Sequence, residues 1–221
     1  MTELNNGKLG GPAKSLLTPE NCCLMMIDYQ PVPFSTVRSM DPQLLINNAI
    51  GVAKTAKAFG VPTILTSVLE ERFDGPFLPQ LREVFDGREA INRTGNNPWE
   101  DERVVAEVEK TGRQKILFAG LWTGNCIALP VLSAMEDGFE AYVVADACGD
   151  ANETAHAMAL QRMIQAGAQP ITWQILMLEL LRDWANEDKA AAVNEIAKQH
   201  AGVQGQAAIY FEGMVADRAG R

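Results

Sequence analysis

An apolar stretch in the middle of the chain ends at a cysteine: Lys115-Ile-Leu-Phe-Ala-Gly-Leu-Trp-Thr-Gly-Asn-Cys126. Its apolar residues predict a strand, and residues 127–135 predict a helix. Cys126 would then lie at a helix N-terminus, just beyond the carboxyl end of a strand. Partial positive charge and free N–H groups at such a position lower the pKa of a thiol and bind an oxyanion. The alternative is a small buried residue in a tight turn, because free cysteines are often buried.

Other apolar runs alternate with helical stretches on both sides of this segment. In addition to 115–122 we predict strands at 22–28, 62–68, 90–93, 141–146 and 168–173. The first run is almost continuously apolar, which is typical of a strand buried on both faces of a parallel sheet. The alternation predicts a three-layer α/β/α sandwich with a mainly parallel, doubly wound sheet. Pro170 cannot donate to a ladder, so the last strand is expected at an edge.

Two helix starts carry recognisable capping signals. Asp41 is followed by proline, which predicts an N-cap for a helix that ends at Gly60. Asp150 and Glu153 have capping-box spacing and predict the start of another helix. Between the second and third strands we expect a loop with a short helix, at residues 69–89.

The length of 221 residues fits one α/β domain with an additional arm. We divide the chain into a flexible segment at 1–15, a folded domain at 16–185 and a helical arm at 186–221. Apolar residues of the arm have no obvious partner within one domain, and we expect them to contact neighbouring subunits. They include Ile196, Ile209, Tyr210, Phe211 and Met214.

Composition excludes several classes of partner. The net charge of −9 provides no basic footprint for nucleic acid or an anionic membrane. No apolar run approaches the roughly 20 residues that span a bilayer, and the start lacks the features of a signal peptide, so we expect a cytoplasmic protein. Neither the four cysteines nor the two histidines have metal-ligand spacing. We therefore expect no metal and no cofactor.

Chemically versatile residues follow three of the predicted strands: Asp28, Arg93 and Cys126. Ligands of such sheets bind beyond the carboxyl ends of the strands. A thiol with a pKa of about 8.5 is mostly protonated at neutral pH, so a nucleophilic cysteine needs a base or a cation nearby. Asp28 could be the base and Arg93 the cation. The alternatives are a turn cap for Asp28 and a surface ion pair for Arg93, although a carboxylate after six apolar residues needs some partner.

Several motifs in the chain resemble those of one family in the same order. The chain resembles the isochorismatase-like (cysteine hydrolase) family in four segments: Met26-Ile-Asp28-Tyr-Gln30, Gly120-Leu-Trp-Thr-Gly-Asn-Cys126, Ala134-Met-Glu-Asp-Gly-Phe139 and Val144-Ala-Asp-Ala147. The resemblance spans about residues 16–184. Three further segments resemble its YcaC-like subgroup: Ile91-Asn-Arg-Thr-Gly-Asn-Asn-Pro-Trp99, Gln165-Ala-Gly-Ala-Gln169 and Leu181-Arg-Asp-Trp184. The members of this subgroup are octameric hydrolases of unassigned specificity.

The resemblance implies roles for the residues at the strand ends. Asp28 would be the general base and Cys126 the nucleophile. A non-proline cis peptide is implied at Leu121–Trp122, where the N–H groups of Trp122 and Cys126 would face an oxyanion. Amidases of the family have a lysine as the third residue, and Arg93 is the best match here. The metal-binding histidines of nicotinamidase-type members have no counterpart at residues 65–74.

These observations favour a cysteine-dependent hydrolase of a small-molecule amide or similar C–N substrate, with an Asp/Arg/Cys triad and a thioester intermediate. One alternative is a vinyl-ether hydrolase of an isochorismate-like substrate. Another is a non-catalytic oligomeric scaffold with the hydrolase fold. Phe34, Trp99 and Trp122 are candidates for the pocket wall, with core packing as the alternative. A homo-octamer is expected from the resemblance alone.

Overall fold

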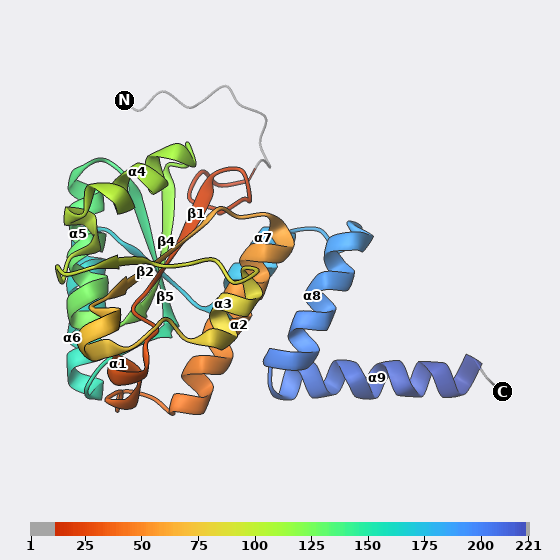
Figure 1. Cartoon of the computed structure of the whole chain (residues 1–221). Coiled ribbons are helices and arrows are strands. Elements are labelled where there is room, and N and C mark those ends of the chain that lie inside the picture. The colour runs from red at the N-terminus through yellow and green to blue at the C-terminus, as the bar shows by residue number, and fades with distance from the viewer. Residues whose placement is uncertain (1–11, 220–221) are drawn as a thin grey trace, which may run out of the picture.

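The computed structural model describes residues 12–219, so most of the expected flexible segment at 1–15 lies outside the described part. A sheet of six strands in the order β3-β2-β1-β4-β5-β6 forms the middle layer, and every pair is parallel (Figure 1). This confirms the predicted α/β sandwich. The strands are β1 Cys22–Ile27, β2 Thr63–Val68, β3 Ile91–Arg93, β4 Lys115–Leu121, β5 Glu140–Gly149 and β6 Gln169–Ile171.

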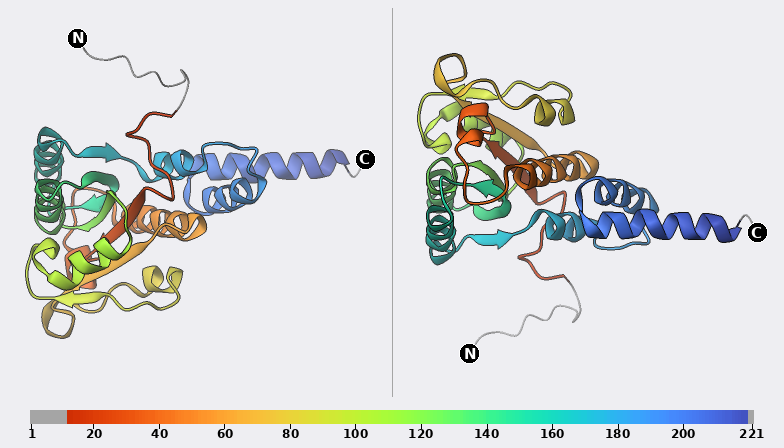
Figure 2. Two further views of the ribbon diagram at one scale, coloured as in Figure 1. Left: turned by 90° about the horizontal axis from the view of Figure 1, so that it is seen from above. Right: turned by 90° about the horizontal axis from the view of Figure 1, so that it is seen from below.

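Helices cover both faces of the sheet. The larger core lies under α1 Pro31–Ser35, α2 Pro42–Phe59, α3 Pro79–Val84, α7 Trp173–Leu181 and α8 Glu187–His200. The smaller core lies under α4 Glu102–Lys110, α5 Ala128–Glu136 and α6 Glu153–Ala166. Figures 1 and 2 show α2, α3, α7 and α8 on the opposite side of the strands from α4, α5 and α6.

Strand β1 runs through the centre of the sheet and contributes to both cores. Cys22, Leu24 and Met26 pack in the larger core. Cys23, Met25 and Ile27 point the other way, into the smaller core. Side chains alternate between the faces of a strand, so a strand with a core on each side needs an unbroken apolar run.

The helix starts agree with the sequence at one position and differ at the other. Asp41 caps α2 by accepting from the N–H of Leu44, as predicted. The predicted cap at Asp150 is wrong, because Asn152 accepts from the N–H of Ala155 and caps α6. The carboxylate of Asp150 is instead bonded to backbone N–H groups nearer the strand ends. The prediction of β6 at a sheet edge is confirmed.

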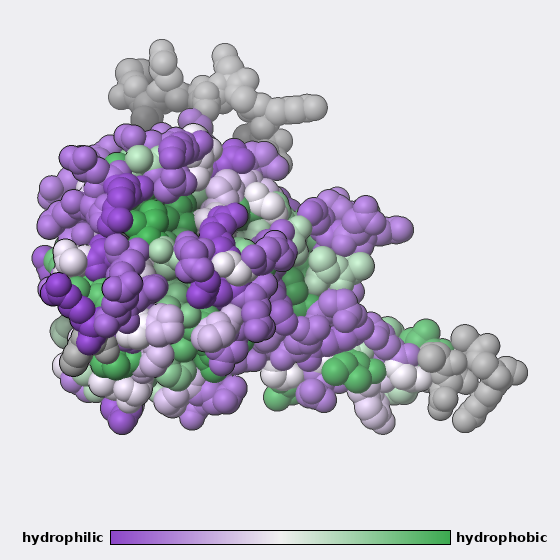
Figure 3. Space-filling view, in the orientation of Figure 1, coloured by the Kyte–Doolittle hydropathy of each residue, from purple (hydrophilic) through white to green (hydrophobic). Residues whose placement is uncertain are grey.

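Two helices at the C-terminus form an arm. Helix α8 packs on α2, whereas α9 Val203–Ala219 projects away from the body in every view (Figures 1 and 2). Ile196, expected to lack a partner within the domain, is instead buried in the larger core. Helix α9 leaves apolar side chains exposed, and Figure 3 shows apolar surface on the projecting arm: Val203, Ile209, Tyr210, Phe211, Met214 and Val215. Within residues 12–219, no helix is both long and apolar enough to cross a membrane.

Gly120 allows β4 to approach β1 closely near the carboxyl ends of both strands. It pairs with Ile27 and has a φ of 152°. A Cβ atom at this position would lie 2.1 Å from the carbonyl oxygen of Ile27. Only glycine fits this contact without displacing the backbone. The contact brings the residue after β1 next to the segment that leads to Cys126.

We expect Gly120→Ala to lower the free energy of unfolding by more than about 3 kcal/mol, because the new methyl group overlaps a backbone oxygen. Gly138→Ala is the matched control, since Gly138 also has a positive φ of 90° but no atom within 4 Å of its added Cβ. That control should lose only about 1 kcal/mol. Urea denaturation of the two variants measures the difference, and equal losses would contradict the steric argument.

Candidate active site

Asp28 and Arg93 meet in a buried ion pair at the carboxyl ends of the strands. Asp28 directly follows β1, and Arg93 is the last residue of β3. Arg93 Nη2 donates to Asp28 Oδ2 over 2.6 Å, and each side chain is only 1% exposed. Arg93 Nη1 donates to the carbonyl of Gly95. The arrangement corresponds to the carboxylate and the cation that the sequence predicted beside each other.

Cys126 lies in η3 Thr123–Ile127, a π-helical turn that leads into α5. It is 6% exposed, and both Asp28 and Arg93 are close enough to change its pKa. The expectation of a lowered pKa is wrong for the resting site. Burial raises the pKa of the Cys126 thiol to about 12; the charge of Asp28 adds to the shift and Arg93 opposes it. Cys126 is the fourth residue of its turn, in which the N–H groups of Asn125 and Ile127 both donate to the carbonyl of Trp122.

Asp28 has the protonation behaviour of a base that works near neutral pH. Burial raises its pKa from 3.8 to about 6, while Arg93 and the Cys126 thiol lower it. Its Oδ1 makes no hydrogen bond of full geometry among the described residues, although the thiol is near enough to interact. At pH 7 Asp28 is therefore an ionised carboxylate beside the protonated thiol of Cys126. One oxygen of this carboxylate is available to accept the thiol proton.

Polar residues outside the predicted site hold the turn around Cys126. Asp150 Oδ2 accepts from the N–H of Gly124 over 2.7 Å. The buried hydroxyl of Thr123 lies 2.8 Å from Nδ1 of His156. Burial lowers the pKa of His156, so the ring is neutral at pH 7. His156 thus supports the turn through its contact with Thr123.

Gln30 is a second residue whose importance sequence reasoning missed. Its buried side-chain amide donates to the carbonyls of Val68 and Gly75, over 2.9 and 2.6 Å. Its Oε1 accepts from the N–H of Val68 over 2.9 Å. These bonds fix the end of β2 against the segment that follows Asp28. The available signal was a buried amide two residues beyond a buried carboxylate.

The aromatic pocket candidates separate into two groups. Phe34 and Trp122 are half-buried against the larger core, and the indole N–H of Trp122 bonds to α1 at the Pro33 carbonyl. Trp99 is fixed in the smaller core, where its N–H donates to Asp137 over 2.7 Å and its ring packs edge-on against a phenylalanine. Its placement fits the alternative of core packing. The peptide bond between Leu121 and Trp122 is cis.

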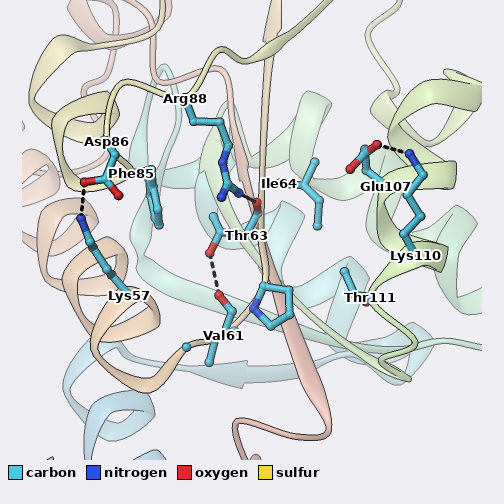
Figure 4. A pocket seen from close by; sticks show the side chains of 12 residues that line it. Lys57, Val61, Thr63, Ile64, Phe85, Asp86, Arg88, Glu107, Lys110 and Thr111 are labelled. Carbon is cyan, nitrogen blue, oxygen red and sulfur yellow. Dashed lines mark hydrogen bonds and ion pairs between the residues drawn. The ribbon is translucent and has the colours of Figure 1, made fainter.

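A cavity of about 540 Å³ opens at the amino end of β2, at the opposite end of this strand from the Asp28–Arg93 pair (Figure 4). Four of its charged groups form pairs: Lys57 with Asp86 over 2.7 Å, and Lys110 with Glu107 over 2.5 Å. The fifth, Arg88, donates to the carbonyl of Thr63 over 2.7 Å. We therefore leave it out of the candidate site. In the part of the chain that is described, no group of three or more histidine, cysteine, aspartate or glutamate residues could hold a metal ion.

Comparison with known proteins agrees with this geometry. A family model described as the isochorismatase domain matches residues 22–175, and the chain belongs to this family. "Probable hydrolase YcaC" of Escherichia coli K12 is 39% identical over 177 residues, which cover 80% of this chain and 85% of that protein. Within the family, the chain belongs to the YcaC-like subgroup.

Two solved structures support the assignment to this subgroup. YcaC from Pseudomonas aeruginosa, with hexane-2,5-diol and covalent acrylamide, has a TM-score of 0.86 and 34% identity, covering 91% of this chain and all of that one. The Escherichia coli ycaC gene product, described as an octameric hydrolase of unknown specificity, has a TM-score of 0.87 and 34% identity. That match covers 92% of this chain and 100% of the other.

We expect Arg93→Met to lower the free energy of unfolding by about 3–5 kcal/mol at pH 7, because it leaves the buried Asp28 carboxylate without its partner. Asp28→Asn should lower it by less, because burial already disfavours the charge that this substitution removes. The double variant should lose less than the sum, by about 1 kcal/mol or more. Urea denaturation at one fixed protein concentration measures all four proteins. Additive losses would show that the two side chains are not coupled.

Proposed function

We propose that this protein is a cysteine-dependent hydrolase of a small amide or a similar C–N substrate. The observation that supports the proposal most directly is the buried Asp28 carboxylate, which lies close to the Cys126 thiol. Its Oδ2 is paired with Arg93, and its Oδ1 has no hydrogen-bond partner among the described residues. The three residues come from three separate strand ends. Membership of the isochorismatase family and the similarity to a probable hydrolase support the same reading.

In the first half of the proposed reaction, Asp28 takes the proton of Cys126. The sulfur attacks the carbonyl carbon, an S–C bond forms, and the carbonyl oxygen becomes an oxyanion. We assign its stabilisation to the backbone N–H groups of Trp122 and Cys126, as the family resemblance implies. The C–N bond then breaks, and the leaving amine takes the proton from Asp28. A thioester on Cys126 remains.

In the second half, a water molecule attacks the thioester while Asp28 accepts one of its protons. The C–S bond breaks, the acid is released, and the proton on Asp28 returns to the sulfur of Cys126. Arg93 stays protonated throughout because a guanidinium does not lose its proton near neutral pH. Its role is to orient Asp28 and to stabilise the negative charge that moves between the carboxylate and the thiol.

Acrylamide is a suitable probe of the thiol because the YcaC structure from Pseudomonas aeruginosa contains it covalently bound. We expect intact-mass measurement to show one adduct on Cys126 and none in Cys126→Ala. The rate should rise with pH through about 6, because Asp28 accepts the thiol proton only after losing its own. The other three cysteines are completely buried, which limits background labelling.

Asp28→Asn should remove the rise near pH 6 without unfolding the protein at 25 °C. An equal adduct in Cys126→Ala, or an inert thiol in the unmodified protein, would contradict the proposed nucleophile. The inert thiol would favour the non-catalytic scaffold. A screen of amides, carbamates and nitriles, read by turnover and by the mass of trapped acyl-enzyme, then tests the C–N substrate class.

We also propose that the protein is a homo-oligomer, with the octamer of the Escherichia coli relative as the expected form. The support in this chain is helix α9, which projects from the body with Tyr210 73% and Phe211 67% exposed. Aromatic side chains that extend into water on a projecting helix are stabilised when another subunit covers them.

Light scattering should give a mass near eight times 24.1 kDa for the unmodified chain. The double substitution Tyr210→Asp, Phe211→Asp should shift the protein to smaller species, because charged groups oppose burial. Gln206→Asp adds a charge at another exposed position of α9 and should leave the mass unchanged. A monomeric unmodified chain would refute the proposed assembly.

A further inference from the structure

The turn η1 Glu70–Asp74, between β2 and α3, is fastened to the site from two directions. The N–H of Leu69 donates to the carbonyl of Arg93 over 3.0 Å. At the other end, Gln30 Nε2 donates to the carbonyl of Gly75 over 2.6 Å. Arg93 is the cation of the site, and Gln30 follows the base by two residues. The last residue of the turn is therefore held between the backbone segments that carry the base and the cation.

That last residue, Asp74, is a second carboxylate, and it lies on the segment that these bonds hold beside the residues of the ion pair. It is half-buried, and its charge contributes to raising the pKa of Asp28. Burial raises the pKa of Asp74 itself, and Arg93 opposes this shift. The groups that act on Asp28 are thus Arg93 from β3, Cys126 from η3 and Asp74 from η1. With both carboxylates ionised, these groups carry one more negative charge than positive.

The only cation among these groups, Arg93, is buried away from an incoming carboxylate, although its Nε has no hydrogen-bond partner among the described residues. Arg93 is 3% exposed, and its two terminal nitrogens donate to Asp28 and to Gly95. A cavity of about 520 Å³ beside Arg93 is lined by three further carboxylates, Glu100, Asp101 and Glu102, and by one other cation. That cation, Arg103, is itself paired with Asp101 over 2.6 Å. A smaller cavity beside Arg93 adds one cation, Arg72, and one carboxylate, Glu71. Carboxylates still outnumber cations around Arg93, so an anion that approaches the strand ends meets repulsion.

We propose that Asp74 sets the charge preference of the site, so that its substrate is an uncharged or cationic small amide and not a carboxylate. The inference rests on the proposed function of Cys126 as the nucleophile. It separates the amide hypothesis from the vinyl-ether alternative, because an isochorismate-like substrate carries carboxylate groups. Asp74 acts through its field on the approach to the thiol and on Asp28, and takes no proton in the reaction.

Iodoacetamide and iodoacetate test this preference because they are similar in size and differ in charge. In both reactions the sulfur displaces iodide: an S–C bond forms, the C–I bond breaks, and Asp28 receives the thiol proton. Mass spectrometry gives the two rate constants for Cys126. Their ratio within one variant cancels any change in thiol reactivity or folded fraction that affects both reagents equally.

For each thiol, the ratio of the iodoacetamide rate constant to the iodoacetate rate constant measures the preference. We expect this ratio to be higher for Cys126 in the unmodified protein than for free cysteine. Asp74→Asn should reduce this preference by about five-fold, because one negative charge near the approach is lost. Asp74→Glu restores the charge and should restore the preference. Glu71→Gln removes an exposed carboxylate from the same turn and serves as the matched control, with a smaller effect because water and salt screen its charge.

The outcomes distinguish this inference from the proposed nucleophile. An unchanged ratio in Asp74→Asn, with Cys126 still alkylated, overturns the role of Asp74 and leaves the nucleophile in place. An equal change in Glu71→Gln also overturns it, because any carboxylate of the turn would then suffice. If neither reagent modifies Cys126 at any pH, no open approach exists and both proposals fail.

Discussion

Burial of the Asp28 carboxylate is the constraint around which this end of the molecule is organised. A charge that follows six apolar strand residues is costly unless a partner neutralises it, and Arg93 provides that partner from two strands away. The pairing requires β1, β2 and β3 to end in register, which Gln30 secures by bonding to both backbone groups of Val68. On the other side of β1, Gly120 allows β4 to approach β1 closely near the carboxyl ends of both strands.

In the proposed reaction, Asp28 is the base and Cys126 the nucleophile, and the resting site gives the two groups different pKa values. Burial raises the pKa of both Asp28 and Cys126, but the carboxyl reaches only about 6 while the thiol reaches about 12. The proton therefore stays on sulfur until a substrate draws the electrons of the thiol into bond formation. Such a site does not depend on a standing thiolate, which protects the cysteine from oxidation between turnovers. Arginine suits this arrangement because its charge is permanent.

Sequence reasoning located the strands and the three residues at their ends because both depend on local signals. The unbroken apolar run before Asp28 identifies a central parallel strand, and its abrupt polar end marks the edge where ligands bind. The missed residues depend on contacts that sequence spacing does not reveal. Asp150 lost its predicted cap role because Gly124, 26 residues away, uses its carboxylate. Trp99 lies in the core because Asp137 from another element accepts its N–H.

The raised pKa of Asp28 also links the folding equilibrium to pH. A carboxyl whose pKa is about 6 in the folded state and 3.8 in its ordinary state holds its proton more tightly when the chain is folded. Its favourable contribution to stability is complete below about pH 3.8 and is lost as the pH rises through about 6. The ionised base is thus the less stable form of the folded chain at this residue. The proposed function therefore needs the protonation state of Asp28 that stabilises the folded chain less.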